Sequence, residues 1–410
     1  MKIKGILGLA LMLIVAVFSL AIFSGSTVGI GEMLPSDPAE VMMENFKFVK
    51  NIMIWFMLML VAFLMLFIKK FEWGVALAVL LSAAGSFIVY LLIQDLYFDA
   101  GWSQDVMLMG VICAITVVIA IGCFLGTVKM WQYLLIGLLF APVFALIEWV
   151  MGNVTLYDNV YTQDPGGSML VHMCAAYFGL GCAIAIRDKR AFNEPMYTST
   201  HSVSFVWLAS MLLWVLWPSF VTALLPGDMV FWGMVTCYLA GMGSILSAWI
   251  VCVAIQKKVN PLIYTYAMLA GPVAIGAPLL MVGPWAAILI GIIAGAFSAF
   301  CFIYLQPLLC KKLGTLDVMG VHNLHGIGGW IGAFSSVVIL AILSTAPNYM
   351  VEVGSEAAVT NLVMAFIVFA LSIGFGIIMG LILKFTRGEM TDEQIFSDEA
   401  DFIRNDAPAE

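Results

Sequence analysis

Long apolar segments are the feature that most constrains the fold of this chain. About twelve of them, each with the roughly 20 mainly apolar residues that a membrane-spanning helix needs, follow one another with short links. Apolar residues make up 63% of the sequence and charged residues 10%, which excludes a soluble globular protein. We expect an all-α polytopic membrane protein. The predicted spans are residues 3–23, 48–68, 72–94, 104–126, 131–151, 167–186, 202–225, 229–256, 261–281, 284–309, 318–345 and 359–383.

The lysines and arginines predict the orientation of the spans. With the N-terminus inside, 15 of the 17 basic residues fall in inner segments, and only Lys47 and Lys50 lie outside. Both termini are therefore predicted to be cytoplasmic, in a multi-pass protein of the cell membrane. The first segment also resembles a secretory signal, but its apolar run of about 19 residues exceeds a typical signal core and favours a retained helix. Cleavage would leave about eleven helices.

The links are too short for a separate soluble domain, so residues 1–387 are predicted to form one integral membrane domain. Residues 388–410 form an acidic cytoplasmic tail, because eight acids and one arginine lie between Glu389 and the end. A solvated tail is the favoured interpretation and a docking segment the alternative. Thr391-Asp392-Glu393-Gln394 resembles a capping box and predicts a short helix there.

Two histidines, His172 and His322, lie inside predicted spans and share a Val-His core. An ionisable side chain in hydrocarbon is costly and marks a transport path or an active site. The second to sixth spans and the seventh to eleventh spans each comprise five helices, so the second set must enter the membrane from the opposite side. This indicates a 5+5 inverted repeat with the site at the repeat interface. Each histidine lies in the last helix of its repeat, so the two are predicted to meet.

The depth of the histidines adds a condition. Five or six residues into a helix correspond to roughly 9 Å, whereas half the hydrocarbon core is about 15 Å. Both helix starts must therefore be recessed beneath vestibules. Gly166-Gly167 and Gly314, with Asp164 and Asp317 as helix-start residues, permit such broken starts.

Two facing imidazoles in an apolar wall favour a small polar neutral solute, because they offer hydrogen bonds and reject bare ions. The alternatives are weaker. His322-x-x-His325 could bind a metal, but the chain has only four histidines and no Cys-x-x-Cys pair. A proton relay needs buried carboxylates, and Glu148 is the only one more than two residues inside the ends of a predicted span. Neither a phosphate-binding loop nor a nucleophile constellation is present, so we expect no enzyme, cofactor, metal or nucleic-acid partner.

Several motifs carry a family resemblance. Gly166-Gly167-Ser168-Met169…His172…Ala176-Tyr177-Phe178-Gly179-Leu180 and Gly320-Val321-His322-Asn323-Leu324-His325-Gly326 resemble signatures of Rh proteins in the ammonium transporter/Rh (Amt/Mep/Rh) superfamily. The similarity extends through Leu213-Trp214-Val215-Leu216-Trp217-Pro218-Ser219-Phe220 and Leu269-Ala270-Gly271-Pro272-Val273-Ala274-Ile275-Gly276. The Asn-Leu-His-Gly motif favours the Rh branch.

The resemblance implies a homotrimer with one pore per subunit, in which ammonium is deprotonated near the outer vestibule and ammonia is conducted. It implies a role for each of nine residues in this sequence. These are the twin pore histidines His172 and His322, the gate positions Phe220 and Ile121, the pore-wall residues Trp217, Val318 and His325, and the outer vestibule acids Glu148 and Asp164.

Three positions depart from the family pattern. Ile121 replaces one of two gate phenylalanines, Val203 replaces an acid of the inner vestibule, and Val221 replaces an asparagine after Phe220. The loop between Glu148 and Asp164 is also long. These changes leave three hypotheses: an ammonia channel, a channel for carbon dioxide or another small neutral molecule, and a non-conducting structural or sensory relative.

Overall fold

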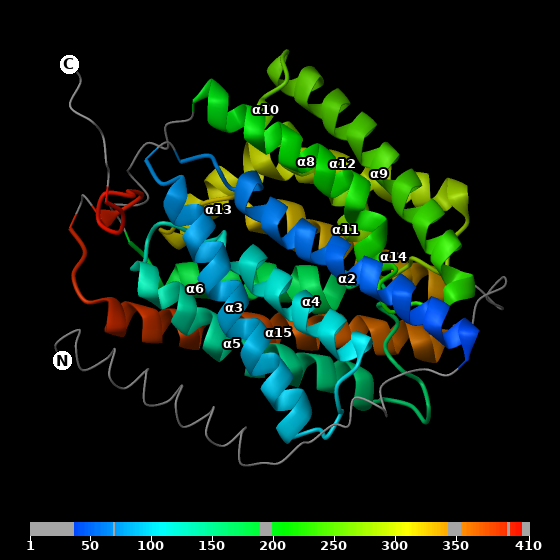
Figure 1. The fold of residues 1–410 in the computed structure, drawn as a ribbon. Coiled ribbons are helices and arrows are strands. Elements are labelled where there is room, and N and C mark those ends of the chain that lie inside the picture. The colour runs from blue at the N-terminus through cyan, green and yellow to red at the C-terminus, as the bar shows by residue number, and fades with distance from the viewer. Residues whose placement is uncertain (1–36, 69, 189–198, 343–353, 392–393, 404–410) are drawn as a thin grey trace.

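The computed structural model describes residues 37–403 apart from 69, 189–198, 343–353 and 392–393 (Figure 1). The first predicted span, 3–23, and the question of its cleavage lie outside the described residues. Every regular element within them is helical, as expected. The elements in chain order are α2 (Pro38–Leu64), α3 (Trp73–Leu96), α4 (Gln104–Ile121), α5 (Met130–Asn153), η2 (Ser168–Met173), α6 (Cys174–Ile186), α8 (Thr200–Val221), α9 (Gly227–Gln256), α10 (Pro261–Ala267), α11 (Ala270–Ala274), α12 (Pro284–Phe300), η3 (Cys301–Leu305), α13 (Gln306–Leu313), η4 (His322–Gly326), α14 (Ile327–Ile342) and α15 (Ser355–Arg387).

Ten helical stretches among the described residues are long and apolar enough to cross a membrane. The predicted span 261–281 is not one of them, because it breaks into α10, α11 and a run of turns. Pro272 causes the first break, since it has no N–H for the carbonyl four residues earlier. That carbonyl, of Met268, instead accepts a hydrogen bond from Ser244 Oγ on α9 at 2.6 Å. The prediction of one continuous helix here was wrong.

The two sets of five segments pack alike, as expected for a 5+5 inverted repeat. In the first set α3 packs along α5, and in the second α9 packs along α12, so second and fourth segments pair in both. Glycine makes each approach close. A Cβ on Gly137 of α5 would collide with the Ser82 carbonyl, and one on Gly291 of α12 with the Ala240 carbonyl. Small residues allow helix backbones to approach in this way in membranes.

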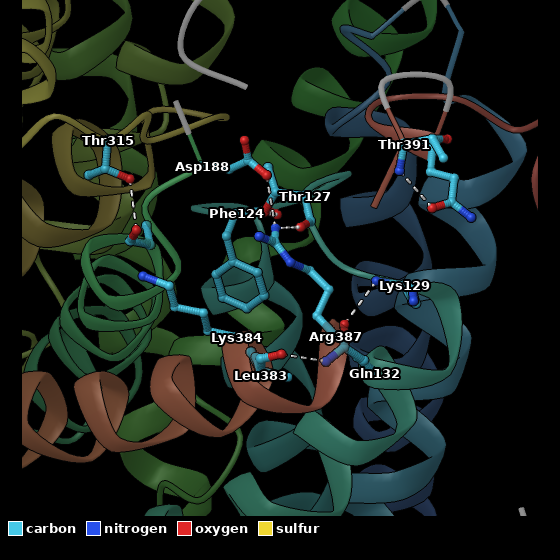
Figure 2. A network of polar contacts seen from close by, with 12 residues as sticks. Phe124, Thr127, Lys129, Gln132, Asp188, Thr315, Leu383, Lys384, Arg387 and Thr391 are labelled. Carbon is cyan, nitrogen blue, oxygen red and sulfur yellow. Dashed lines mark hydrogen bonds and ion pairs between the residues drawn. The ribbon is translucent and has the colours of Figure 1, made fainter. Parts of the chain in front are cut away.

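The long helix α15 lies against α6 on one side of the bundle (Figure 1). Its C-terminal end is held by polar contacts (Figure 2). Arg387 Nη1 donates to the Thr127 carbonyl at 2.7 Å and to Asp188 Oδ2 at 3.0 Å. Gln132 Nε2 donates to the Leu383 carbonyl at 2.9 Å. These contacts tie the last helix to α5, to the turn before it and to the residues after α6.

The segment after α15 folds back onto the bundle. Phe396 N–H donates to the Gly126 carbonyl at 3.0 Å, and the Phe396 ring packs on Gly126. The Asp398 carboxylate accepts from the N–H groups of residues 72, 73 and 74 at 3.0, 3.1 and 2.7 Å and so caps the start of α3. Since residues 395–398 are buried, the favoured expectation of a solvated tail was wrong for this stretch. Thr391 N–H does donate to Gln394 Oε1 at 3.0 Å, as one half of the predicted capping box.

Candidate functional site

Two aspartates organise the starts of the π-helical turns η2 and η4. Asp164 Oδ2 accepts from the N–H groups of Met169 and Leu170, both at 2.9 Å. Asp317 accepts from Val321 N–H at 3.0 Å and from His322 N–H at 2.9 Å. These bonds satisfy N–H groups that a helix start leaves without partners. Because η2–α6 and η4–α14 run in opposite directions, we call the two ends of the site the Asp164 end and the Asp317 end.

Both aspartates lie away from bulk water. Asp317 is 4% exposed and Asp164 is half-buried. Burial raises the pKa of the Asp164 carboxyl to about 7, although the backbone N–H groups it accepts from act in the opposite direction. Burial likewise raises the pKa of Asp317 to about 6 against the same kind of opposition. Asp164 Oδ1 has no hydrogen-bond partner among the described residues.

Each helix start is paired with a broken or ending helix elsewhere in the fold. Gly166 N–H donates to the Gly276 carbonyl at 2.9 Å, in the turns after α11. Val318 and Met319 N–H donate to the Cys123 and Gly122 carbonyls, both at 3.0 Å, just after α4. Irregular backbone inside a membrane protein is stable only where protein groups satisfy it in this way. Both starts are therefore buried within the protein, and their depth in the membrane stays a prediction.

The histidine that faces His172 is His325. The two Nδ1 atoms lie 3.1 Å apart, and the rings stack with centroids 5.1 Å apart and planes at 23°. The predicted pair of His172 and His322 was therefore wrong in its second member, and His325, expected in the pore wall, takes that place. One Nδ1 must carry a proton and the other must accept, so the two imidazoles hold opposite tautomers.

The spacing between each helix-start aspartate and its histidine explains why His172 pairs with His325. Eight positions separate Asp164 from His172, and eight separate Asp317 from His325. Gly167 and Gly320, each three positions after the aspartate, both adopt left-handed backbone with φ of 78° and 64°. The matching Val-His pairs suggested a different alignment, whereas the Asp-to-His distance would have identified His325 from the sequence.

His322 lies beside this pair, toward the Asp317 end. Its ring meets Tyr177 edge-on, with centroids 5.7 Å apart. It lines a small cavity with Asp317 and Asn323; the other lining residues are Leu180, Gln306, Leu309, Cys310, Leu313 and Thr315. Asn323 is fully buried, and neither side-chain polar atom has a partner among the described residues. No prediction had singled out Asn323, although it stands in the Asn-Leu-His-Gly motif.

Aromatic residues of α8 cover His172. Phe220 lies 5.8 Å and Trp217 5.7 Å from the His172 ring, measured between centroids. Both side chains are buried. His172 Nε2 and Trp217 Nε1 have no hydrogen-bond partners among the described residues. The site thus combines an apolar wall with two polar atoms that remain available to a small solute.

The remaining predicted site residues are Glu148, Ile121 and Val318. Glu148 of α5 accepts from Tyr90 Oη at 3.1 and 2.8 Å through its two oxygens, between α3 and α5. Ile121 is fully buried as the last residue of α4. Val318 is buried at the Asp317 end. Their roles in a pore stay predictions.

A bundle of membrane-spanning helices with a polar pair between inverted repeats defines a multi-pass membrane transporter or channel, not an enzyme. The comparisons with known proteins identify which kind. The chain belongs to the Ammonium Transporter Family, whose model matches residues 11–404. It is 32% identical over 367 residues to the ammonium transporter Rh type C of Xenopus laevis, covering 82% of this chain and 76% of that protein.

Two further relatives agree. The structure of Rh50 from Nitrosomonas europaea, a channel of the Rhesus protein family, matches with a TM-score of 0.79 and 32% identity, covering 88% of this chain and 93% of that one. Rhesus-like glycoprotein B of Dictyostelium discoideum is 29% identical over 317 residues, 73% of this chain but only 52% of that longer protein. The resemblance to the Rh branch found in the sequence motifs is therefore confirmed.

Proposed function

We propose that this protein is an Rh-type channel that conducts ammonia through the His172–His325 site. The observation that carries the proposal is the position of this histidine pair between two buried helix starts of opposite direction. The relatives named as ammonium transporters and Rhesus channels support ammonium and ammonia as the substrate class. No cofactor is invoked.

Ammonium must lose its proton before it reaches the pair. A charged group at mid-membrane costs about 2.5–3.5 kcal/mol on insertion scales, and the aromatic wall of Trp217 and Phe220 offers it no counter-charge. Neutral ammonia avoids this cost. It can donate to an imidazole nitrogen and accept from the Trp217 N–H, so the partnerless atoms His172 Nε2 and Trp217 Nε1 match its needs.

Asp164 is the residue we assign to proton acceptance at the outer mouth. A carboxyl group with a pKa of about 7 exchanges protons near neutral pH, and its Oδ1 atom has no partner among the described residues. Glu148, in the same repeat, would attract cations toward that mouth. Val318, His322 and Asn323 would line the way out at the Asp317 end, and Ile121 would share the gate with Phe220.

The orientation and assembly complete the proposal. The distribution of basic residues supports an orientation with the Asp164 end outside and both termini in the cytoplasm, in the cell membrane. A homotrimer embedded in lipid, with one pore per subunit, is proposed from the family resemblance. Native mass spectrometry of the protein released from micelles would measure the subunit number.

Stopped-flow measurements of internal pH in proteoliposomes test the function. We expect wild type to accelerate ammonia entry over empty liposomes, His172→Ala and His325→Ala to alter that rate strongly, and His322→Ala to alter it less. Current recordings on planar bilayers separate neutral from ionic transport. A wild-type rate equal to that of empty liposomes would refute the proposal.

Carbon dioxide is the second candidate solute. It is favoured by the apolar residues Val221 and Ile121, both fully buried, at positions where the family carries asparagine and phenylalanine. Carbon dioxide gradients in the same vesicles, with carbonic anhydrase inside, decide between the two solutes. Acceleration by carbon dioxide alone would replace ammonia in the proposal.

A further inference from the structure

One lysine of α2 is buried without a counter-charge. Lys50 is 4% exposed, although it lies in a helix whose neighbouring residues are largely open. Its Nζ donates to the Thr222 carbonyl and lies 4.9 Å from the centre of the Phe46 ring. Within the described residues no carboxylate oxygen lies within 4 Å of this nitrogen. Because a buried charge is expected to be paired, a buried lysine without a carboxylate partner suggests a role for its charge.

Lys47, one turn earlier on the same helix, is the natural comparison. Its Nζ lies 2.8 Å from Asp105 Oδ2 and 3.6 Å from Glu44 Oε1, so its charge is balanced. It is also more exposed than Lys50. The two lysines thus carry the same charge near the same end of α2, but only that of Lys47 is neutralised by acids.

Lys50 lies beside the outer mouth of the proposed pore. Thr222 is the C-cap of α8 and stands two positions after Phe220, the aromatic residue that covers His172. Val221, between them, lies next to Gly166 in the turn that follows Asp164. The Lys50 ammonium group is therefore held at the Asp164 end, by the same short stretch of α8 that presents Phe220.

Part of the role of Lys50 is structural. A cation stabilises the C-terminal end of a helix and satisfies a carbonyl that the helix leaves free. A neutral donor such as glutamine would satisfy the carbonyl as well. The charge itself has a different consequence, because an uncompensated cation repels other cations over a longer distance than a hydrogen bond extends.

We propose that Lys50 determines specificity at the outer mouth, where its positive charge lowers the occupancy of ammonium and other monovalent cations in favour of neutral solutes. This inference rests on the proposed channel function. It opposes the cation attraction assigned to Glu148 and Asp164. The mouth of this protein thereby has a weaker preference for cations than its two acids alone would give.

Coulomb's law sets the size of the effect. Two like unit charges about 10 Å apart repel by an amount that changes binding roughly twofold in water and roughly twentyfold at an effective dielectric constant of 20. Neutralising Lys50 should therefore lower the half-saturating ammonium concentration by roughly two- to twentyfold. It should strengthen block by a competing cation such as methylammonium by a similar factor.

The test compares wild type with Lys50→Met, Lys50→Gln, Lys50→Arg and Lys47→Met in proteoliposomes at one pH. Initial rates are recorded over a range of total ammonium and again with methylammonium present. We expect Lys50→Met and Lys50→Gln to shift both curves, and Lys50→Arg and Lys47→Met to follow wild type. Lys50→Gln keeps an N–H donor for Thr222, so it decides the question if Lys50→Met does not fold.

These measurements distinguish failure of the Lys50 inference from failure of the proposed function. If wild type conducts ammonia but Lys50→Gln gives the same half-saturation and the same block as wild type, the charge has no role in specificity and this inference is refuted. An equal shift in Lys47→Met would also overturn it, because any surface charge would then suffice. If wild type does not accelerate ammonia entry at all, the proposed function fails, and this inference with it.

Discussion

A double-mutant cycle on the free energy of unfolding tests the His172–His325 pair. The summed destabilisation of the two single variants His172→Leu and His325→Leu should exceed that of the double variant. The two Nδ1 atoms lie 3.1 Å apart, and the side chains are 2% and 8% exposed. Removing one partner leaves a buried polar nitrogen unsatisfied, which costs about 1–3 kcal/mol, whereas replacing both partners by apolar groups can be nearly neutral. The cycle should therefore give a coupling free energy of about 1–3 kcal/mol.

The same cycle with His322 provides the control. His322 is half-buried and contacts Tyr177 edge-on, so His172→Leu and His322→Leu should be additive within about 0.5 kcal/mol. Reversible unfolding in mixed micelles of increasing SDS content, followed by far-ultraviolet circular dichroism, measures all five variants. Additivity in the His325 cycle, or stronger coupling in the His322 cycle, would refute the assignment of the pair.

Three further predictions follow from the described contacts. Asp398→Ala should destabilise the protein by about 1–2 kcal/mol and raise amide hydrogen exchange at the start of α3, whereas Glu399→Ala, at an exposed position, should do neither. Gly291→Ala should cost about 1–3 kcal/mol through overpacking against α9, seen as a lower yield of monodisperse protein in size-exclusion chromatography. In stopped-flow runs at constant ammonium ion concentration, with the rate of empty liposomes subtracted, wild-type flux should rise as pH passes about 7, because only the ionised Asp164 accepts a proton from ammonium; Asp164→Asn should reduce this rise.

The helical bundle could be predicted from the sequence because lipid leaves few alternatives. A chain that must satisfy its backbone inside a membrane forms helices, and hydropathy locates them. The break in the predicted span 261–281 could not be found from hydropathy. It is as apolar as its neighbours, and its break depends on hydroxyl groups of Ser244 and Ser168 that bond the carbonyls of Met268 and Val273 from other helices. Hydropathy does not register such partners.

The error at the histidines has a similar origin. His322 and His325 are three positions apart, so a helical wheel places both on the same side of a helix. Only the backbone geometry separates them: Asp317 binds the His322 N–H and fixes the first turn, and the π-helical turn then carries His325 toward His172. The aspartate and glycine offsets contain this information, but only when the two repeats are aligned through them.

The buried tail segment and Lys50 were missed because their partners are distant in the sequence. Asp398 binds residues more than 320 positions earlier, and Lys50 reaches a carbonyl 172 positions away. An acidic tail and an outer lysine both have an ordinary solvated interpretation when only their neighbours are considered. Only the tertiary contacts of Asp398 and Lys50 show that these side chains are buried.

The histidine pair and the proposed outer mouth are built from different kinds of contact, and this difference affects which of them can set specificity. The histidine pair depends on backbone hydrogen bonds to two aspartates and on two left-handed glycines, so a change of these aspartates or glycines would disturb helix geometry as well as chemistry. The proposed mouth depends instead on side chains such as Val221 and Lys50, and a neutral donor such as glutamine at position 50 would keep the hydrogen bond to Thr222. Selection for a different solute or charge preference would therefore act at the mouth first. Lys50, a buried lysine beside the end of α8 that has no carboxylate partner among the described residues, is a residue of this kind.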